Sequence, residues 1–202
     1  RDRADPTQII AVNQAVDART KGSLEEIAPT TVKPNGYEDW QVPWEKQVET
    51  IADAVGKEDE GDKLIDDTEK AFEEFRHEHA ELQDKSAAIV MPYDGKIGLY
   101  TEEDGRGQFI EDLGMEIPDA LQGDGGSFFV DIAPENYAKL NQVDYLFVLD
   151  YNGSSDALKK DKTFQGLDVV KEGRVRYLDT DTGNAMSMPN PVTIPLSLIH
   201  IS

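Results

Sequence analysis

The sequence predicts an α/β protein in which helices cover both faces of parallel β-sheets. Short apolar segments rich in β-branched residues alternate with helical segments through the second half of the chain, and such alternation indicates parallel βαβ units. The 202 residues suit one larger domain or two small lobes. One helical segment is also long enough, at about 30 Å, to cross from one lobe to another.

The first half of the chain predicts one strand followed by helices. Residues 8–12 are short, apolar and β-branched, as in a buried strand. Residues 20–28 place apolar side chains at helical spacing before a proline, which cannot extend a helix, and residues 30–43 are predicted to form a loop. Helical spacing then predicts two consecutive helices over 44–55 and about 60–82, with an interruption between Gly56 and Gly61.

The second half alternates strands and helices. A Tyr-Asp-Gly turn at 93–95 separates the first two strands, and Gly114 is placed to end the first helix. The predicted strands span 87–91, 97–100, 145–149 and 174–178, and the predicted helices span 108–113, 134–140 and a segment that ends near Val170.

The charge and the missing cysteines exclude several classes of function. Twenty Lys and Arg residues against forty-one Asp and Glu residues give a net charge of −21 at pH 7. Such a surface repels the phosphates of nucleic acids and anionic lipids, so we expect no nucleic-acid partner. The absence of cysteine excludes disulfides, thiolate zinc sites and a cysteine nucleophile.

No motif in the chain indicates catalysis or a metal centre. His77 and His79 are two residues apart on a predicted helix, so their side chains diverge by about 200° and cannot share a metal. Residues 179–183 are similar to a calcium loop, but the glycine is one place early and the closing Glu is missing. The glycine-rich segment 123–127 lacks the spacing of a nucleophile elbow. We therefore expect no catalytic residue, no metal site and no cofactor.

Six segments carry a common pattern in a fixed order. They are ADPTQII at 4–10, IAPT at 27–30, IADAVG at 51–56, FIEDLG at 109–114, VDYLFVL at 143–149 and VKEGRV at 170–175. Together they resemble the siderophore-type substrate-binding proteins of bacterial ABC importers, whose two Rossmann-like lobes are joined by a single long helix. The resemblance implies that 1–57 is the remnant of an incomplete N-terminal lobe, that 58–84 is the interlobe helix and that 85–202 is the C-terminal lobe.

The resemblance also implies something about both ends of the sequence. The secretion signal, any lipid-anchor cysteine and the first strands of the N-terminal lobe would precede Arg1. Residues 196–202 stand where the family has a final amphipathic helix, and we expect them to be truncated or non-native, so no function is drawn from His200. The implied location is the periplasm or the extracellular face of the cell membrane, with a lipid anchor in the full-length protein.

The function implied by the resemblance is capture of a ferric siderophore in a cleft between the lobes, and delivery to the membrane permease of an ABC transporter. We expect a monomer without enzymatic activity. Cobalamin or haem binding on the same scaffold, an α/β enzyme that uses the same cleft, and a surface adhesion or sensor module are the alternatives.

Cleft residues of open α/β sheets come from the carboxyl ends of strands and the loops that follow. By this rule the candidate ligand-binding residues are Trp40, Tyr93, Tyr100, Arg106, Phe128 and Asn184. Arg106 can fork onto chelate oxygens, and its alternative is a surface salt bridge with Asp104 or Glu103. An aromatic ring such as Trp40 can stack on a planar ligand. Packing of Tyr93, Tyr100 and Phe128, and turn capping by Asn184, are the alternatives, while Trp44 is expected to pack in the core.

The family resemblance implies permease docking through one acidic residue on each lobe. Residues 131–135 match the place of this acid in the carboxyl lobe, which makes Glu135 the candidate. Its alternative is an acid in the first turn of a helix, where the helix dipole favours negative charge. The matching acid of the other lobe would precede Arg1.

Overall fold

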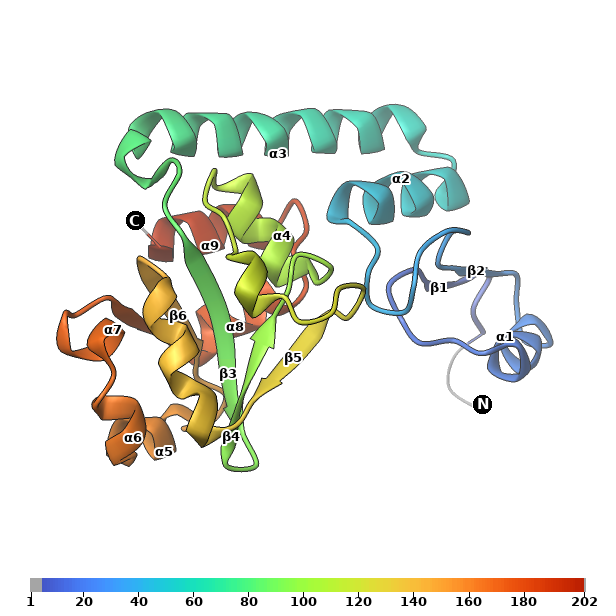
Figure 1. The fold of residues 1–202 in the computed structure, drawn as a ribbon. Helices are drawn as coiled ribbons and strands as arrows, with labels where there is room; N and C mark the ends of the chain where they lie inside the picture. Colours follow the sequence, from blue (N-terminus) through green and yellow to red (C-terminus); the bar gives the residue numbers. More distant parts are fainter. Residues whose placement is uncertain (1–4, 202) are drawn as a thin grey trace. The chain divides into compact units, whose positions relative to one another are not determined.

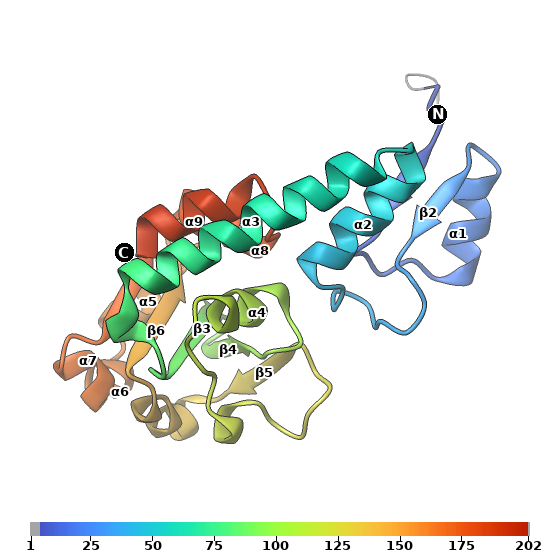
Figure 2. The ribbon, with the colours of Figure 1, turned by 90° about the horizontal axis from the view of Figure 1, so that it is seen from above.

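The computed structural model describes residues 5–201 (Figure 1). The chain divides into two compact units, the first of which ends at Asp67 and the second of which begins at Thr68. The division lies within the helix α3 (Glu58–Glu78), which Figure 2 shows as one unbroken helix. The predicted boundaries at residues 57 and 84, and the role of this helix as an interlobe connection, stay predictions.

The first unit contains a small parallel sheet and its flanking helices. Strand β1 (Ile9–Ala11) pairs in parallel with β2 (Thr30–Val32), and α1 (Ala18–Glu25) connects them. The predicted strand and helix are confirmed, whereas the loop predicted for 30–43 is wrong at its start. Its Thr-Thr-Val segment is β-branched and forms strand β2 by hydrogen-bonding to β1. The proline and glycine residues that follow in the sequence favour a loop and hide this strand.

The helices α2 (Trp44–Val55) and α3 pack closely in this unit because of two glycines. Gly56 ends α2 in the left-handed conformation with a φ of 67°. A Cβ atom on Gly61 would lie 2.5 Å from the Cβ of Ala52, so the bare glycine lets α3 approach α2. The helix therefore resumes at Glu58, and the predicted interruption up to Gly61 is too long. Trp44 is buried, as expected.

The second unit is built on a five-stranded mixed sheet of order β5-β4-β3-β6-β7. Its strands are β3 (Ala87–Tyr93), β4 (Lys96–Tyr100), β5 (Phe129–Ile132), β6 (Tyr145–Leu149) and β7 (Val175–Leu178). The predicted parallel pairing is confirmed for β3, β6 and β7. Strands β4 and β5 run antiparallel to their neighbours. Asp94 and Gly95 both have positive φ, as a two-residue hairpin turn requires, and this turn reverses the chain between β3 and β4.

Helices lie before, between and after these strands. They are η1 (Ala80–Leu82), α4 (Gly105–Asp112), η2 (Asp119–Leu121), η3 (Pro134–Gln142), α5 (Ser155–Lys160), α6 (Lys162–Gln165), α7 (Asp168–Lys171), α8 (Thr180–Ser187) and α9 (Thr193–Ile201). The single helix predicted to end near Val170 is three short helices. The segment similar to a calcium loop begins α8, because the Asp179 carboxylate accepts the backbone N–H of Thr182 at 2.8 Å.

Some expectations fall outside the described residues. These are the start of the segment 4–10, the side chain of His200 and the last residue of the tail 196–202. Within the described range, α9 extends through most of that tail.

One face of the five-stranded sheet carries a large hydrophobic core. Alternate residues of β3 and β6, such as Val90 and Leu146, are fully buried there beneath η3 and the helices α5–α7. Phe164 meets Tyr137 edge to face, with ring centroids 6.0 Å apart. Because successive strand residues point to opposite faces, the side chains between these core positions lie on the other face. That other face carries Tyr93 and Tyr100, two of the predicted site residues.

Candidate functional site

An aromatic row crosses three strands on the face opposite the core that contains Val90 and Leu146. Its members are Tyr93 on β3, Phe129 on β5 and Tyr100 on β4, all at positions that alternate with core residues. The ring centroid of Phe129 lies 5.5 Å from that of Tyr93 and 5.6 Å from that of Tyr100. Tyr100 is buried, whereas Tyr93 and Phe129 are half-buried, so the row offers partly accessible aromatic surface.

Arg106 lies at one end of the aromatic row, in the first turn of α4. Its guanidinium carbon is 3.7 Å from the centre of the Tyr100 ring, which is the geometry of a cation–π contact. Asp104 caps α4 by accepting the backbone N–H of Arg106 at 2.9 Å. The same carboxylate accepts Nε at 2.7 Å and Nη2 at 3.0 Å. The guanidinium is therefore held in one orientation by a helix cap and an aromatic ring.

The alternative role predicted for Arg106 is a surface salt bridge with Asp104 or Glu103. The ion pair with Asp104 exists, but the side chains are only 16% and 5% exposed, so it is not an ordinary surface salt bridge. Burial disfavours the charged guanidinium, yet the hydrogen bonds and charge of Asp104 outweigh burial and raise the pKa of Arg106. Burial also raises the pKa of Tyr100 to about 12, although Arg106 opposes this shift. A permanent positive charge thus lies beside a neutral phenol.

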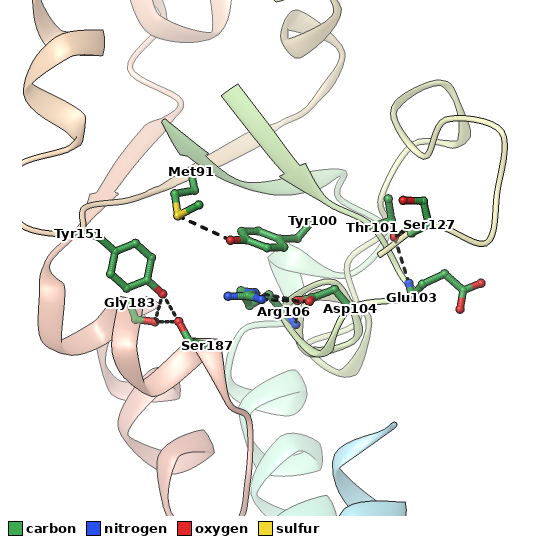
Figure 3. A network of polar contacts seen from close by, with 10 residues as sticks. All are labelled: Met91, Tyr100, Thr101, Glu103, Asp104, Arg106, Ser127, Tyr151, Gly183 and Ser187. Atoms are coloured by element: carbon green, nitrogen blue, oxygen red, sulfur yellow. Dashed lines mark hydrogen bonds and ion pairs between the residues drawn. The ribbon is translucent and has the colours of Figure 1, made fainter. Parts of the chain in front are cut away.

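Tyr151 lies near Tyr100 and Arg106 (Figure 3). It follows β6 by two residues, and its hydroxyl donates to the carbonyl oxygen of Gly183 at 3.1 Å and also hydrogen-bonds Ser187, both on α8. Burial raises its pKa, and the nearby Arg106 guanidinium opposes this shift. Tyr151 is not among the predicted residues, although it follows the end of a strand just as Tyr100 ends one.

The loops around Arg106 are tied down by further hydrogen bonds (Figure 3). The Thr101 hydroxyl donates to the carbonyl oxygen of Ser127 at 2.5 Å and accepts the backbone N–H of Glu103 at 3.3 Å. The Tyr100 hydroxyl lies 3.6 Å from the sulfur of Met91. The end of β4 is therefore fixed to the loop that leads into β5, which keeps Tyr100 in register with Phe129.

The opposite end of the aromatic row carries a polar triad. The Tyr93 hydroxyl donates to the Asp131 carboxylate, and Nζ of Lys96 lies 3.3 Å from the same carboxylate. The hydrogen bond to Asp131 raises the pKa of Tyr93 to about 12 and lowers the pKa of Asp131. The neutral phenol and the carboxylate stabilise one another at neutral pH.

Replacing Asp131 by Asn is expected to lower the pKa of Tyr93 from about 12 toward its ordinary value of 10.0. The raised pKa means that this hydrogen bond stabilises the fold fully below pH 10.0 and that the contribution is lost as pH rises through about 12. Tyrosinate absorbance measured against pH checks this, with Tyr93→Phe to identify the transition and the exposed Asp124→Asn as control. An unchanged titration of Asp131→Asn would contradict the assignment.

The remaining predicted ligand-binding residues are Phe128, Asn184 and Trp40. Phe128 is half-buried, and its ring centroid lies 6.2 Å from that of Phe129. Asn184 is exposed within α8, whose cap is Asp179. Trp40 is exposed in a loop of the first unit, with an unusual positive φ of 69°. Their roles as ligand-binding residues stay predictions.

A cavity lies beside the Tyr93 end of the aromatic row. Its volume is about 250 Å³, and it lies between the β3–β4 turn and α5, lined in part by Tyr93, Tyr137 and Leu158. Among the side chains that the structure describes, no three His, Asp or Glu residues converge on a point where a metal ion could bind. No helix in the described part of the chain is both long and apolar enough to cross a bilayer.

Comparison with known proteins identifies the architecture. The family model described as periplasmic binding protein matches residues 3–182, while no curated protein matches the chain. The iron-uptake ABC transporter substrate-binding protein PiaA of Streptococcus pneumoniae, solved in complex with ferrichrome, is 26% identical. That match covers 98% of this chain and 68% of PiaA, with a TM-score of 0.81.

Two further structures share the fold. A periplasmic solute-binding protein of Mycobacterium smegmatis is 24% identical over 98% of this chain and 67% of its own, with a TM-score of 0.83. FhuD2 of Staphylococcus aureus, solved with ferrioxamine B bound, is 20% identical over 98% of this chain and 75% of its own, with a TM-score of 0.76. The family resemblance of the sequence and the predicted α/β fold class are confirmed. The family model matches most of the 202 residues of this chain, and the chain therefore belongs to the periplasmic binding protein family.

Proposed function

We propose that this chain is part of a substrate-binding protein that captures a ferric siderophore and delivers it to the permease of an ABC importer, without transforming it. The observation that carries the proposal is the fixed guanidinium of Arg106 beside the aromatic row. Rigid aromatic surface next to a few oriented polar groups is the usual composition of a small-molecule site. PiaA and FhuD2, which share this fold, bind the ferric siderophores ferrichrome and ferrioxamine B.

The charge balance favours a siderophore without net negative charge. Arg106 is already paired with Asp104 in a bidentate ion pair, so little positive charge is left uncompensated. The chain as a whole carries a net charge of −21, which repels anions at long range. The core of a ferric trihydroxamate is neutral because its ligands and the ferric ion balance in charge, whereas a ferric tricatecholate is strongly anionic. We therefore propose a ferric hydroxamate as the cargo.

Calorimetric titration of the purified chain with four ligands tests the proposal. These are ferrichrome, a ferric tricatecholate, cobalamin and haem, the last two because the same scaffold could carry them. Saturable binding of ferrichrome, with much weaker binding of the other three, is the expected result. Binding of cobalamin or haem alone would identify that molecule, and not a siderophore, as the cargo. Hydrolytic turnover without binding of any of the four ligands would favour an enzyme.

Glu135 is proposed as a permease-docking residue of this unit. It is exposed in the first turn of η3, where an acid also interacts favourably with the helix dipole. Replacing it by Ala is expected to leave the affinity for ferrichrome unchanged and to slow siderophore uptake by cells about two- to fivefold, the effect of one exposed ion pair. The exposed Asp124→Ala serves as control, and normal uptake by Glu135→Ala would remove the docking role.

The cellular setting follows from the proposed function. Delivery to a membrane permease requires a protein outside the cytoplasmic membrane, so we propose a periplasmic or extracellular location with a lipid anchor in the full-length protein. The proposed functional form is a monomer, because one copy carries both the aromatic row and the docking acid.

A further inference from the structure

Gly98 occupies the middle of the sheet face that carries the aromatic row. It lies on β4 between Lys96 and Tyr100 along that face, and it pairs with Met91 on β3 and Asp131 on β5. A Cβ atom on Gly98 would lie 2.1 Å from both Cε2 and Cζ of Phe129. Atoms cannot approach that closely, so the Phe129 ring fills the space where a side chain of β4 would stand.

The position of this ring makes the aromatic row continuous. Phe129 inclines from β5 across β4, and its ring contacts Tyr93 from β3 as well as its direct neighbour Tyr100. The same missing Cβ atom would lie 3.1 Å from Cε1 of Tyr93, so the tyrosine ring also uses the space above Gly98. Any side chain at residue 98 would separate the three rings and interrupt the apolar surface that leads to Arg106.

Ring packing over a glycine can also serve the sheet alone. An aromatic residue that covers a strand glycine from the neighbouring strand stabilises a sheet without contacting any ligand. Two observations favour a role in binding. Phe129 remains partly exposed, and the row ends at a guanidinium whose orientation is fixed by Asp104 and Tyr100.

We infer that Gly98 determines specificity in the proposed siderophore site, by seating Phe129 as the apolar floor against which the methylene-rich face of a neutral ferric hydroxamate packs. The inference rests on the proposed function and adds to it a residue that touches no ligand. Gly98 is a positioning residue, and Phe129 makes the contact. A side chain at residue 98 would displace the Phe129 ring, so that the chelate could no longer pack flat against it.

Binding of ferrichrome to four chains tests the inference: the unchanged chain, Gly98→Ala, Phe129→Leu and the double variant. Each single variant is expected to bind about tenfold more weakly, the contribution of a well-placed aromatic contact. The double variant is expected to bind no more weakly than Gly98→Ala alone, because both changes remove the same ring placement. Gly22→Ala is the control, since nothing lies within 4 Å of that added Cβ atom.

Thermal unfolding of each variant separates binding from folding. If Gly98→Ala fails to fold, Phe129→Leu carries the test, because it introduces no clash. Folded single variants that bind ferrichrome as tightly as the unchanged chain would overturn the inference and leave the proposed function intact. Failure of the unchanged chain to bind ferrichrome would overturn the proposed function together with the inference that rests on it.

Discussion

Replacing Arg106 by Ala is expected to weaken ferrichrome binding by about 1 to 3 kcal/mol, which is about five- to 150-fold in affinity. The guanidinium lies over the ring of Tyr100, beside the aromatic row. Its orientation is fixed before a ligand arrives, so little conformational entropy is lost when it donates to the oxygens of the chelate. Fluorescence or calorimetric titration measures the loss.

Two controls separate a contact with the chelate from a structural effect. Loss of Arg106 leaves the Asp104 carboxylate, which is only 5% exposed, without its ion-pair partner. The variant Arg106→Ala/Asp104→Asn removes that buried charge, and it should recover stability but not binding. Arg19→Ala, at an exposed position on α1, should change neither. Full affinity in Arg106→Ala would return Arg106 to a purely structural role.

Replacing Gly107 by Ala is expected to cost about 3 kcal/mol of unfolding free energy, because the added methyl group would clash with backbone atoms. A Cβ atom there would lie 1.9 Å from the carbonyl oxygen of Thr101 and 2.5 Å from its carbonyl carbon. Both are backbone atoms, so relief requires α4 to move away from the end of β4. Because Arg106 immediately precedes this glycine, ferrichrome affinity should fall as well.

Denaturant unfolding followed by circular dichroism measures this cost. The matched control is Gly22→Ala in α1, which meets no neighbour and should stabilise its helix by up to about 1 kcal/mol. An unchanged unfolding midpoint for Gly107→Ala would show that α4 is not held against Thr101 in the way described.

Much of the fold is predictable from the sequence because its strongest local patterns are also its buried elements. The run Tyr145–Leu149 is apolar and contains two aromatic residues, and it becomes β6 with the predicted bounds. The pattern from Trp44 to Val55 likewise becomes α2. Strand β2 was not predicted, because three residues carry little periodicity and depend on a partner about twenty positions earlier in the chain.

The site is only partly predictable for a different reason. Tyr93, Tyr100 and Arg106 were found because they end or follow strands, and a strand end is visible in the sequence. Phe129 was missed because its ring reaches the site only by leaning across Gly98, which depends on the register of β4 against β5. Pairing register is set by tertiary contacts, and the antiparallel direction of β5 is not encoded in any local pattern.

Paramagnetic broadening of NMR signals tests most directly whether the aromatic row and Arg106 contact the cargo. Spectra of the chain with ferrichrome are compared with spectra containing its diamagnetic gallium(III) analogue. We expect the ferric chelate to broaden selectively the signals of Tyr100, Arg106 and Phe129, while the signals of Phe164 and Val169, on the opposite face of the sheet, stay sharp. Broadening centred away from Arg106, with the signals of the aromatic row unaffected, would contradict this expectation.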